Sequence, residues 1–142
     1  MHGRYFLDTN IFLRIVVKDD KKKAEDCAKL LEMARAGKIH VVTSHLVLAE
    51  FVWTCLSLYR LKKLEVVKLV SGIASIPHLS VIDVYDTLRA LALYEKYSVK
   101  FIDALIASHS FFQEHGCSII SYDTDFDILG LTRLEPAHLL SQ

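Results

Sequence analysis

Short apolar runs alternate along the chain with longer segments of helical periodicity. The apolar runs predict four strands, at residues 5–7, 39–42, 79–82 and 117–120. Strands that alternate with helices are joined by crossover connections, which make a sheet mainly parallel and place helices on both of its faces. Residues 131–134, before Pro136, predict a short fifth strand at an edge. The expected fold is therefore α/β, a three-layer α/β/α sandwich with a mainly parallel sheet of four to five strands.

Helical segments fill the intervals between these runs. They are expected at residues 10–17, 24–36, 44–59, 60–75, 85–97 and 102–115. Gly37 and Gly116 follow two of them as C-caps, and Thr43 and Ser44 offer an N-cap for a third. The charged run 18–23 is expected to form a solvated turn. Residues 44–75 predict a buried, apolar helical hairpin, which offers a homodimer surface or a groove for a partner helix unless it is simply core.

Length and composition limit the classes of protein that this chain can belong to. With 142 residues it is expected to form a single domain, residues 1–142. Seventeen Lys and Arg balance seventeen Asp and Glu, so phosphate binding must be local or carried by a metal. Three separated cysteines among apolar residues indicate reduced thiols in a cytoplasmic protein. We expect no signal segment and no membrane span, and we expect Trp53 to lie in the core.

Two acidic residues follow predicted strands. Asp8 comes directly after the first strand, and Asp123 comes after the fourth, separated from it by Ser121 and Tyr122. In an open parallel sheet, ligands bind beyond the carboxyl ends of the strands, so acids at these positions point to a site. An Asx turn or a helix N-cap is the alternative for Asp123, and it suits Asp125 even better.

Two further acids stand inside apolar helices. Glu50 lies within the apolar segment 46–53, where an ionised carboxylate must be neutralised, paired with a basic residue or bound to a cation, unless its side chain reaches solvent at the edge of the helix. Asp103 stands at the start of a helix among small and apolar residues, where compensation of the helix dipole is the alternative. If the four acids converge at one sheet edge, a hard divalent cation such as Mg²⁺ or Mn²⁺ relieves their mutual repulsion.

The order and spacing of these residues resemble those of the PIN-domain nucleases. The resemblance rests on Asp8-Thr9-Asn10, on the acid inside 44–53, on Asp103-Ala104-Leu105-Ile106-Ala107 and on the segment 121–126. It covers essentially the whole chain and is closest to the VapC-like toxin ribonucleases. It implies that Asp8, Glu50, Asp103 and Asp123 hold the metal, supported by Thr9, Asn10, Ser121 and Asp125. Tyr122 departs from the pattern, since a small polar residue is expected there.

The function implied by this resemblance is metal-dependent hydrolysis of RNA phosphodiester bonds. It also implies a toxin role, a small antitoxin partner and a homodimer. Basic residues at 18, 21–23, 60, 62 and 63 are candidates for holding flanking phosphates. The alternatives are a non-catalytic RNA-binding or protein-binding module of the same fold, and a phosphoacceptor enzyme or receiver in which Asp8 takes the phosphoryl group. The four intact acids favour the nuclease, and Asn10 disfavours the dehalogenase-type phosphoacceptor, which needs Asp at that position.

Overall fold

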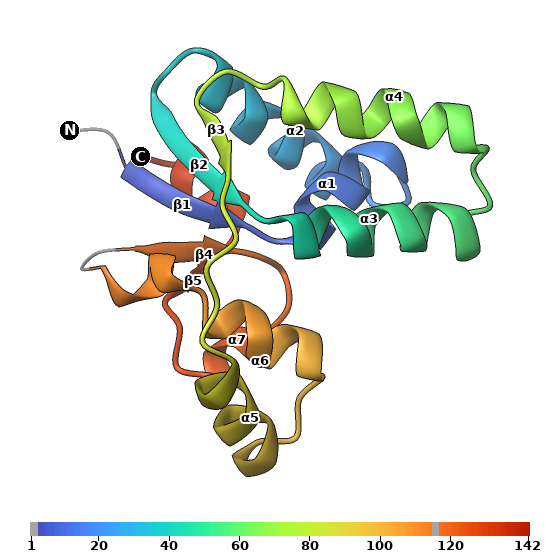
Figure 1. Ribbon diagram of the computed structural model, residues 1–142. Coiled ribbons are helices and arrows are strands. Elements are labelled where there is room, and N and C mark those ends of the chain that lie inside the picture. The colour runs from blue at the N-terminus through green and yellow to red at the C-terminus, as the bar shows by residue number, and fades with distance from the viewer. Residues whose placement is uncertain (1–2, 115–116) are drawn as a thin grey trace.

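The computed structural model describes residues 3–114 and 117–142, and strand β1 (Gly3–Leu7) lies in the middle of its sheet (Figure 1). The other strands are β2 (Ile39–Thr43), β3 (Leu79–Val81), β4 (Ser118–Ile120) and β5 (Arg133–Leu134). The strand order is β3-β2-β1-β4-β5, and every neighbouring pair is parallel. The predicted α/β fold and the fifth edge strand are confirmed.

The order of the strands changes direction between β1 and β4. From β1 the chain proceeds outward through β2 to β3, and it then returns to place β4 on the other side of β1. The register pairs Leu7 with Ile120, and the Asp8 N–H donates to the Ile120 carbonyl oxygen at 3.2 Å. The carboxyl ends of β1 and β4 therefore lie side by side at a topological switch point, where ligands bind in sheets of this kind.

Helices cover both sides of the sheet (Figure 1). One group consists of α1 (Thr9–Val16), α2 (Lys21–Arg35), α3 (His45–Ser57) and α4 (Lys63–Ala74). The other contains α5 (Thr87–Lys96), α6 (Phe101–Ala107), the 3₁₀ turn η1 (Ser110–Gln113) and α7 (Asp125–Ile128). A last helix, α8 (Pro136–Leu140), packs against α2. Phe6, Leu7, Ile119 and Ile120 of the central strands are fully buried between these layers.

Two predicted helix boundaries are wrong. Residues 21–23 are not part of a turn but open α2, because the Asp20 side chain accepts a hydrogen bond from the Lys23 N–H and caps the helix there. The helix predicted at 102–115 stops at Ala107. The Ser108 hydroxyl donates to the Leu105 carbonyl oxygen at 2.7 Å, and the chain then turns into η1. The predicted cap Gly116 lies outside the described residues.

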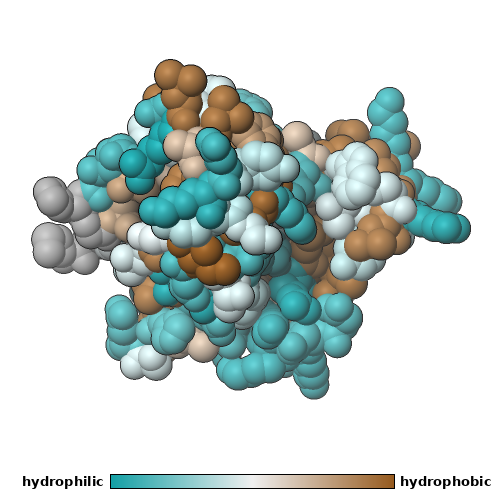
Figure 2. All heavy atoms as spheres, turned by 90° about the horizontal axis from the view of Figure 1, so that it is seen from below, coloured by the Kyte–Doolittle hydropathy of each residue, from teal (hydrophilic) through white to brown (hydrophobic). Residues whose placement is uncertain are grey.

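The α3–α4 hairpin forms as predicted, but it is not buried all round. Trp53 is 68% exposed, Leu58 66% and Leu64 73%, so the prediction of a core position for Trp53 is wrong. Figure 2 shows apolar and pale residues at the surface of the lobe that projects to the right, where this hairpin lies. In the described part of the chain, no helix is long and apolar enough to cross a membrane.

Candidate metal centre

A cavity of about 210 Å³ lies beyond the carboxyl ends of β1 and β4. The side chains that line it come from the start of α1, the middle of α3, the start of α6 and the loop after β4. They are Asp8, Thr9, Asn10, Leu13, Glu50, Thr54, Lys100, Asp103 and Asp123. The four acids singled out in the sequence thus meet in one cavity, although they are far apart along the chain. None of them takes part in an ion pair with a lysine or arginine of the described segments.

Asp8 is held by a network of short polar side chains. The Ser121 hydroxyl donates to one Asp8 carboxylate oxygen at 2.7 Å, and the Asn10 amide donates to the same oxygen at 3.1 Å. The Asn10 amide also donates to the Ser121 hydroxyl, and the Asn10 carbonyl oxygen accepts from the Tyr122 N–H at 3.3 Å. The Ser121 hydroxyl accepts in turn from the Asp123 N–H at 3.0 Å. The network therefore links β1 to the loop after β4 and fixes the orientation of the Asp8 carboxylate.

Glu50 points from α3 into the same cavity and is half-buried. The Thr9 hydroxyl donates to its carboxylate, so α1 orients Glu50 as Ser121 orients Asp8. No lysine or arginine of the described residues pairs with Glu50, so the alternative of a salt bridge is excluded among them.

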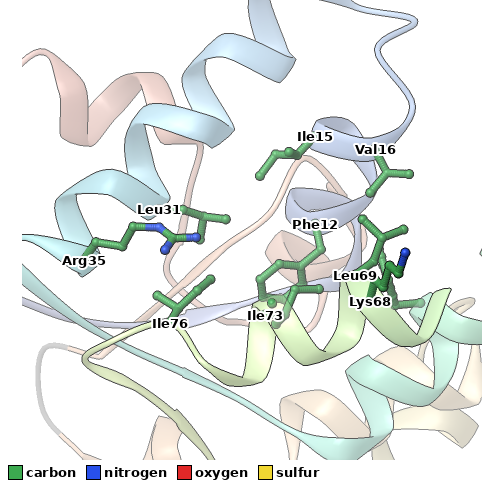
Figure 3. Close-up of a pocket in the computed structure, with 11 residues that line it drawn as sticks. Phe12, Ile15, Val16, Leu31, Arg35, Lys68, Leu69, Ile73 and Ile76 are labelled. Atoms are coloured by element: carbon green, nitrogen blue, oxygen red, sulfur yellow. The ribbon is translucent and has the colours of Figure 1, made fainter. Parts of the chain in front are cut away.

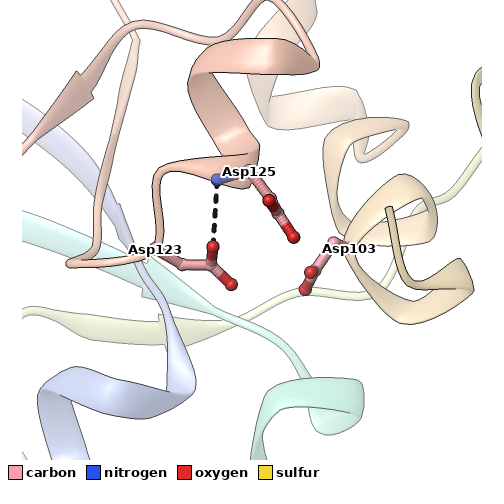
Figure 4. Close-up of side chains that lie close together, drawn as sticks. All are labelled: Asp103, Asp123 and Asp125. Carbon is pink, nitrogen blue, oxygen red and sulfur yellow. Dashed lines mark hydrogen bonds between the residues drawn. The ribbon is translucent and has the colours of Figure 1, made fainter. Parts of the chain in front are cut away.

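Asp103, Asp123 and Asp125 form the tightest cluster of acids in the described part of the chain. One carboxylate oxygen of each lies within 4.8 Å of the others, and Figure 4 shows the three side chains converging from α6, from the loop after β4 and from the start of α7. The Asp125 N–H donates to an Asp123 carboxylate oxygen at 2.9 Å. Asp103 is 5% exposed, yet its Oδ2 atom has no hydrogen-bond partner. A buried carboxylate oxygen without a partner fits a cation ligand.

Burial and mutual repulsion raise the pKa values of two of these acids. Burial raises the pKa of Asp8 to about 6, although the hydrogen bond from Ser121 opposes this rise. Burial, together with the charges of Asp123, Asp8 and Glu50, raises the pKa of Asp103 to about 7. Oxygen ligands of this kind suit hard divalent cations, and a bound cation would offset both the burial and the repulsion that raise these pKa values.

Two other residues of the predicted site region lie outside the cavity. Tyr122 turns toward α2, where its hydroxyl oxygen lies 3.6 Å from the Cys27 sulfur and its ring lies 4.6 Å from the Lys23 ammonium. It therefore anchors the loop that carries Asp123 and does not line the acidic cavity. Asp127 does not line the cavity either and is paired with Arg133 at 3.1 Å.

Lys100 is a site residue that the sequence did not indicate. It is the one basic side chain among those that line the acidic cavity, and its charge opposes the rise in the pKa of Asp103. The basic residues that we expected near the site, at positions 18, 21–23, 60, 62 and 63, do not line this cavity. Lys100 stands directly before α6, three residues from Asp103, which is the only signal that would have placed it here.

Comparisons with known proteins agree with this fold. A family model described as PIN domain matches residues 5–130, whereas no curated protein matches the chain. Among solved structures, VapBC2 from Rickettsia felis, bound to a DNA fragment from its promoter, is 20% identical with a TM-score of 0.64, covering 93% of this chain and 98% of that one. VapC20 of Mycobacterium tuberculosis, a sarcin-ricin loop cleaving toxin, is 16% identical with a TM-score of 0.62, covering 90% and 96%. PAE2754 from Pyrobaculum aerophilum is 17% identical, with a TM-score of 0.62 and full coverage of both chains.

Proposed function

Because the chain belongs to the PIN domain family, we propose that its acidic cavity is the active site of a metal-dependent endoribonuclease. The observation that carries this proposal is the convergence of Asp8, Glu50, Asp103 and Asp123 on one cavity, none of them paired with a basic residue of the described segments. The proposed substrate class is supported by a solved structure of the same fold that is described as a sarcin-ricin loop cleaving toxin.

The residues in and around the acidic cavity would have three roles. The four acids, with Asp125 beside them, would hold Mg²⁺ or Mn²⁺, since carboxylate oxygens suit these ions. When bound, such an ion lowers the pKa of water and stabilises charge on a phosphate. Ser121, Asn10 and Thr9 orient the carboxylates. Lys100 supplies a positive charge at the edge of the cavity, where a phosphate of the RNA would pass.

The proposal is tested by removing one ligand at a time. Asp8→Asn, Glu50→Gln, Asp103→Asn and Asp123→Asn should each abolish cleavage of single-stranded RNA in Mg²⁺ or Mn²⁺, with the fold intact by circular dichroism. Asp127→Asn is the matched control, because this acid lies outside the cavity and pairs with Arg133. Full activity in any two of the four variants would remove the assignment. Radiolabelled phosphate trapped on Asp8 would instead favour the phosphoacceptor alternative.

We also propose that the protein is a toxin restrained by a small antitoxin. An apolar groove of about 220 Å³ runs between α1, α2, α3 and α4, and Figure 3 shows Phe12, Ile15 and Leu31 along it with Arg35 and Lys68 at its rim. Such a groove suits an antitoxin helix with apolar anchors and acidic flanks. Arg35→Glu combined with Lys68→Glu should weaken binding of the cognate antitoxin and leave RNA cleavage unchanged, whereas equal affinity for the antitoxin would contradict this assignment of the groove.

A homodimer is the last part of the proposal. The exposed side chains Leu56, Leu64 and Val67 give the α3–α4 hairpin a second apolar face beside the groove. Light scattering is expected to give twice the mass of the 16.2 kDa chain, and Val67→Glu should convert the dimer to a monomer. A wild-type monomer at micromolar concentration would contradict the dimer.

A further inference from the structure

A second cavity, of about 160 Å³, adjoins the acidic one. It lies between α1 and the turn that follows α3, and its lining consists of Asn10, Leu13, Arg14, Val17, Asp19 and Tyr59. Asn10 and Leu13 also line the acidic cavity, so the two hollows share a wall. Any chain of nucleotides that crosses the acids along α1 would reach this second cavity next.

The lining of the second cavity suits a flat and uncharged group. Leu13 and Val17 provide apolar contacts, and the Tyr59 ring is 37% exposed. The Arg14 guanidinium is paired with the Asp19 carboxylate at 3.2 Å, so the two charges offset each other and leave no excess positive charge for a phosphate. The pair still offers donors and an acceptor at the rim, which the polar edge of a nucleobase can use.

The position of Tyr59 is fixed by the end of α3. Its N–H donates to the Thr54 carbonyl oxygen at 3.2 Å, and the Leu61 N–H donates to the Cys55 carbonyl oxygen at 3.0 Å. Thr54 itself lines the acidic cavity, which links the two hollows a second time. The Tyr59 hydroxyl makes no hydrogen bond within the described part of the chain, nor does its ring contact another described ring. The backbone at Tyr59 is therefore fixed, while its aromatic side chain is available to a ligand.

We propose that this cavity binds one nucleobase of the RNA next to the scissile phosphate, with the base stacked on Tyr59. This inference rests on the proposed nuclease function and adds a base subsite to it. Single-stranded RNA is bound in this way elsewhere, with unstacked bases on aromatic side chains and their edges on polar groups. The cavity is smaller than a typical pocket for a whole ligand, which agrees with its taking a single base.

The test removes the base and the ring in turn. An RNA oligonucleotide with one mapped cleavage site is compared with six versions of itself. Each version carries a single abasic nucleotide, at one of the three positions on either side of the cleavage site. For the wild type, kcat/KM should fall roughly 5- to 100-fold at one of these positions, as expected for loss of one stacked base. Tyr59→Ala should lower kcat/KM on the intact RNA by a similar factor, with no further fall at the same abasic position.

Two control variants separate the ring from other effects. Tyr59→Phe keeps the aromatic face and should still cleave the intact RNA better than the abasic one, because the hydroxyl has no partner within the described residues. Trp53→Ala removes a more exposed aromatic side chain from α3 that lines neither cavity. Its ratio of kcat/KM for intact and abasic RNA should equal that of the wild type. If Trp53→Ala loses the difference in kcat/KM between intact and abasic RNA, or if Tyr59→Ala keeps this difference, the subsite is not at Tyr59.

The failure of this inference differs from the failure of the nuclease itself. If the wild type cleaves the intact RNA in Mn²⁺, Asp8→Asn does not, and no abasic position matters, then only the base subsite is excluded. If the wild type shows no chelator-sensitive cleavage of any RNA, the proposed function fails and the subsite fails with it.

Discussion

Ser121 joins more parts of the site than any acid does. Its hydroxyl donates to Asp8 and accepts from Asn10 and from the Asp123 N–H. Ser121→Ala should therefore reduce metal affinity or cleavage about 10- to 100-fold, as is usual when the partner of a ligand is removed. Because its hydrogen bond lowers the pKa of Asp8, the acidic limb of the pH profile should also move to higher pH. Calorimetric metal titration and pH–rate profiles measure both effects.

Ser118→Ala is the matched control for Ser121→Ala. Ser118 is a buried serine of β4, the strand that Ser121 follows, but it does not line the acidic cavity. Its substitution should leave the pH profile in place. An unshifted profile in Ser121→Ala, or equal shifts in both variants, would show that the hydroxyl does not position Asp8.

Lys100 carries the second prediction at the scale of single residues. Lys100→Gln should weaken RNA binding, and the slope of log Kd against log salt should decrease by about 1, as for the loss of one phosphate contact. Binding is measured with the inactive Asp8→Asn background to prevent cleavage. Lys96→Gln, an exposed lysine of α5 that lies outside the cavity, is the control. An unchanged salt slope in Lys100→Gln would remove this lysine from the RNA path.

The acids were predictable from the sequence, whereas Lys100 was not, for a physical reason. A carboxylate that ends an apolar strand or interrupts an apolar helix conflicts with its surroundings, and Asp8 and Glu50 are conspicuous for that reason. A lysine before a helix is an ordinary solvated residue by its local pattern. Whether such a lysine lies near the acids depends on how the helices pack, and only the fold shows that Lys100, directly before α6, lines the acidic cavity.

At the scale of elements, His109 explains why α6 ends early. Its Nδ1 atom accepts a hydrogen bond from the Phe111 N–H at 3.0 Å, so the other ring nitrogen carries the proton and donates to the Ile82 carbonyl oxygen at 2.7 Å. The ring is 1% exposed and packs against Phe6. A single buried side chain thus joins η1 to the end of β3, at the place where the periodicity of the sequence predicts a continuous helix.

Replacement of His109 should therefore cost stability. His109→Ala leaves a cavity and removes the partners of two buried backbone groups, so the free energy of unfolding should fall by about 2–4 kcal/mol. Urea denaturation measures this change. His138→Ala, in the short last helix α8, serves as a control for loss of an imidazole elsewhere. A loss of less than about 0.5 kcal/mol for His109→Ala, within the range of surface substitutions, would contradict a structural role for this ring.

At the scale of the whole molecule, the strand pattern predicted the sheet, because parallel strands are buried on both faces and their apolar runs are conspicuous. The surface of the α3–α4 hairpin was not predictable in the same way. A helix that is apolar all round is predicted to be buried in the core. Trp53 and Leu64 are nevertheless exposed, because no other element of the described chain covers them. Apolar composition alone does not distinguish a face buried within the chain from one available to a partner.

The stability of the metal-free protein should depend on pH through its acidic cavity. The pKa of Asp8 is raised to about 6 and that of Asp103 to about 7, mainly by burial, so the folded state holds protons that the unfolded chain releases above about pH 4. Since the folded state binds more protons in this range, the contribution of these two groups to stability is greatest at low pH and is lost as the pH rises through 6 and 7. In chelator, the melting temperature should therefore be lower at pH 8 than at pH 5.5, as measured by scanning fluorimetry.

The same argument gives the response to metal and to substitution. Asp103→Asn removes one of the two titrating groups and the repulsion around it, so the fall in melting temperature between pH 5.5 and pH 8 should shrink, whereas Asp127→Asn should keep it. Millimolar Mg²⁺ or Mn²⁺ should raise the melting temperature of the wild type more at pH 8 than at pH 5.5, because the ion must displace protons at the lower pH. Carboxylates that share one cavity must make the stability of the fold depend on their charges. A melting temperature that changes with neither metal nor pH would therefore contradict the assignment of these carboxylates to one cavity.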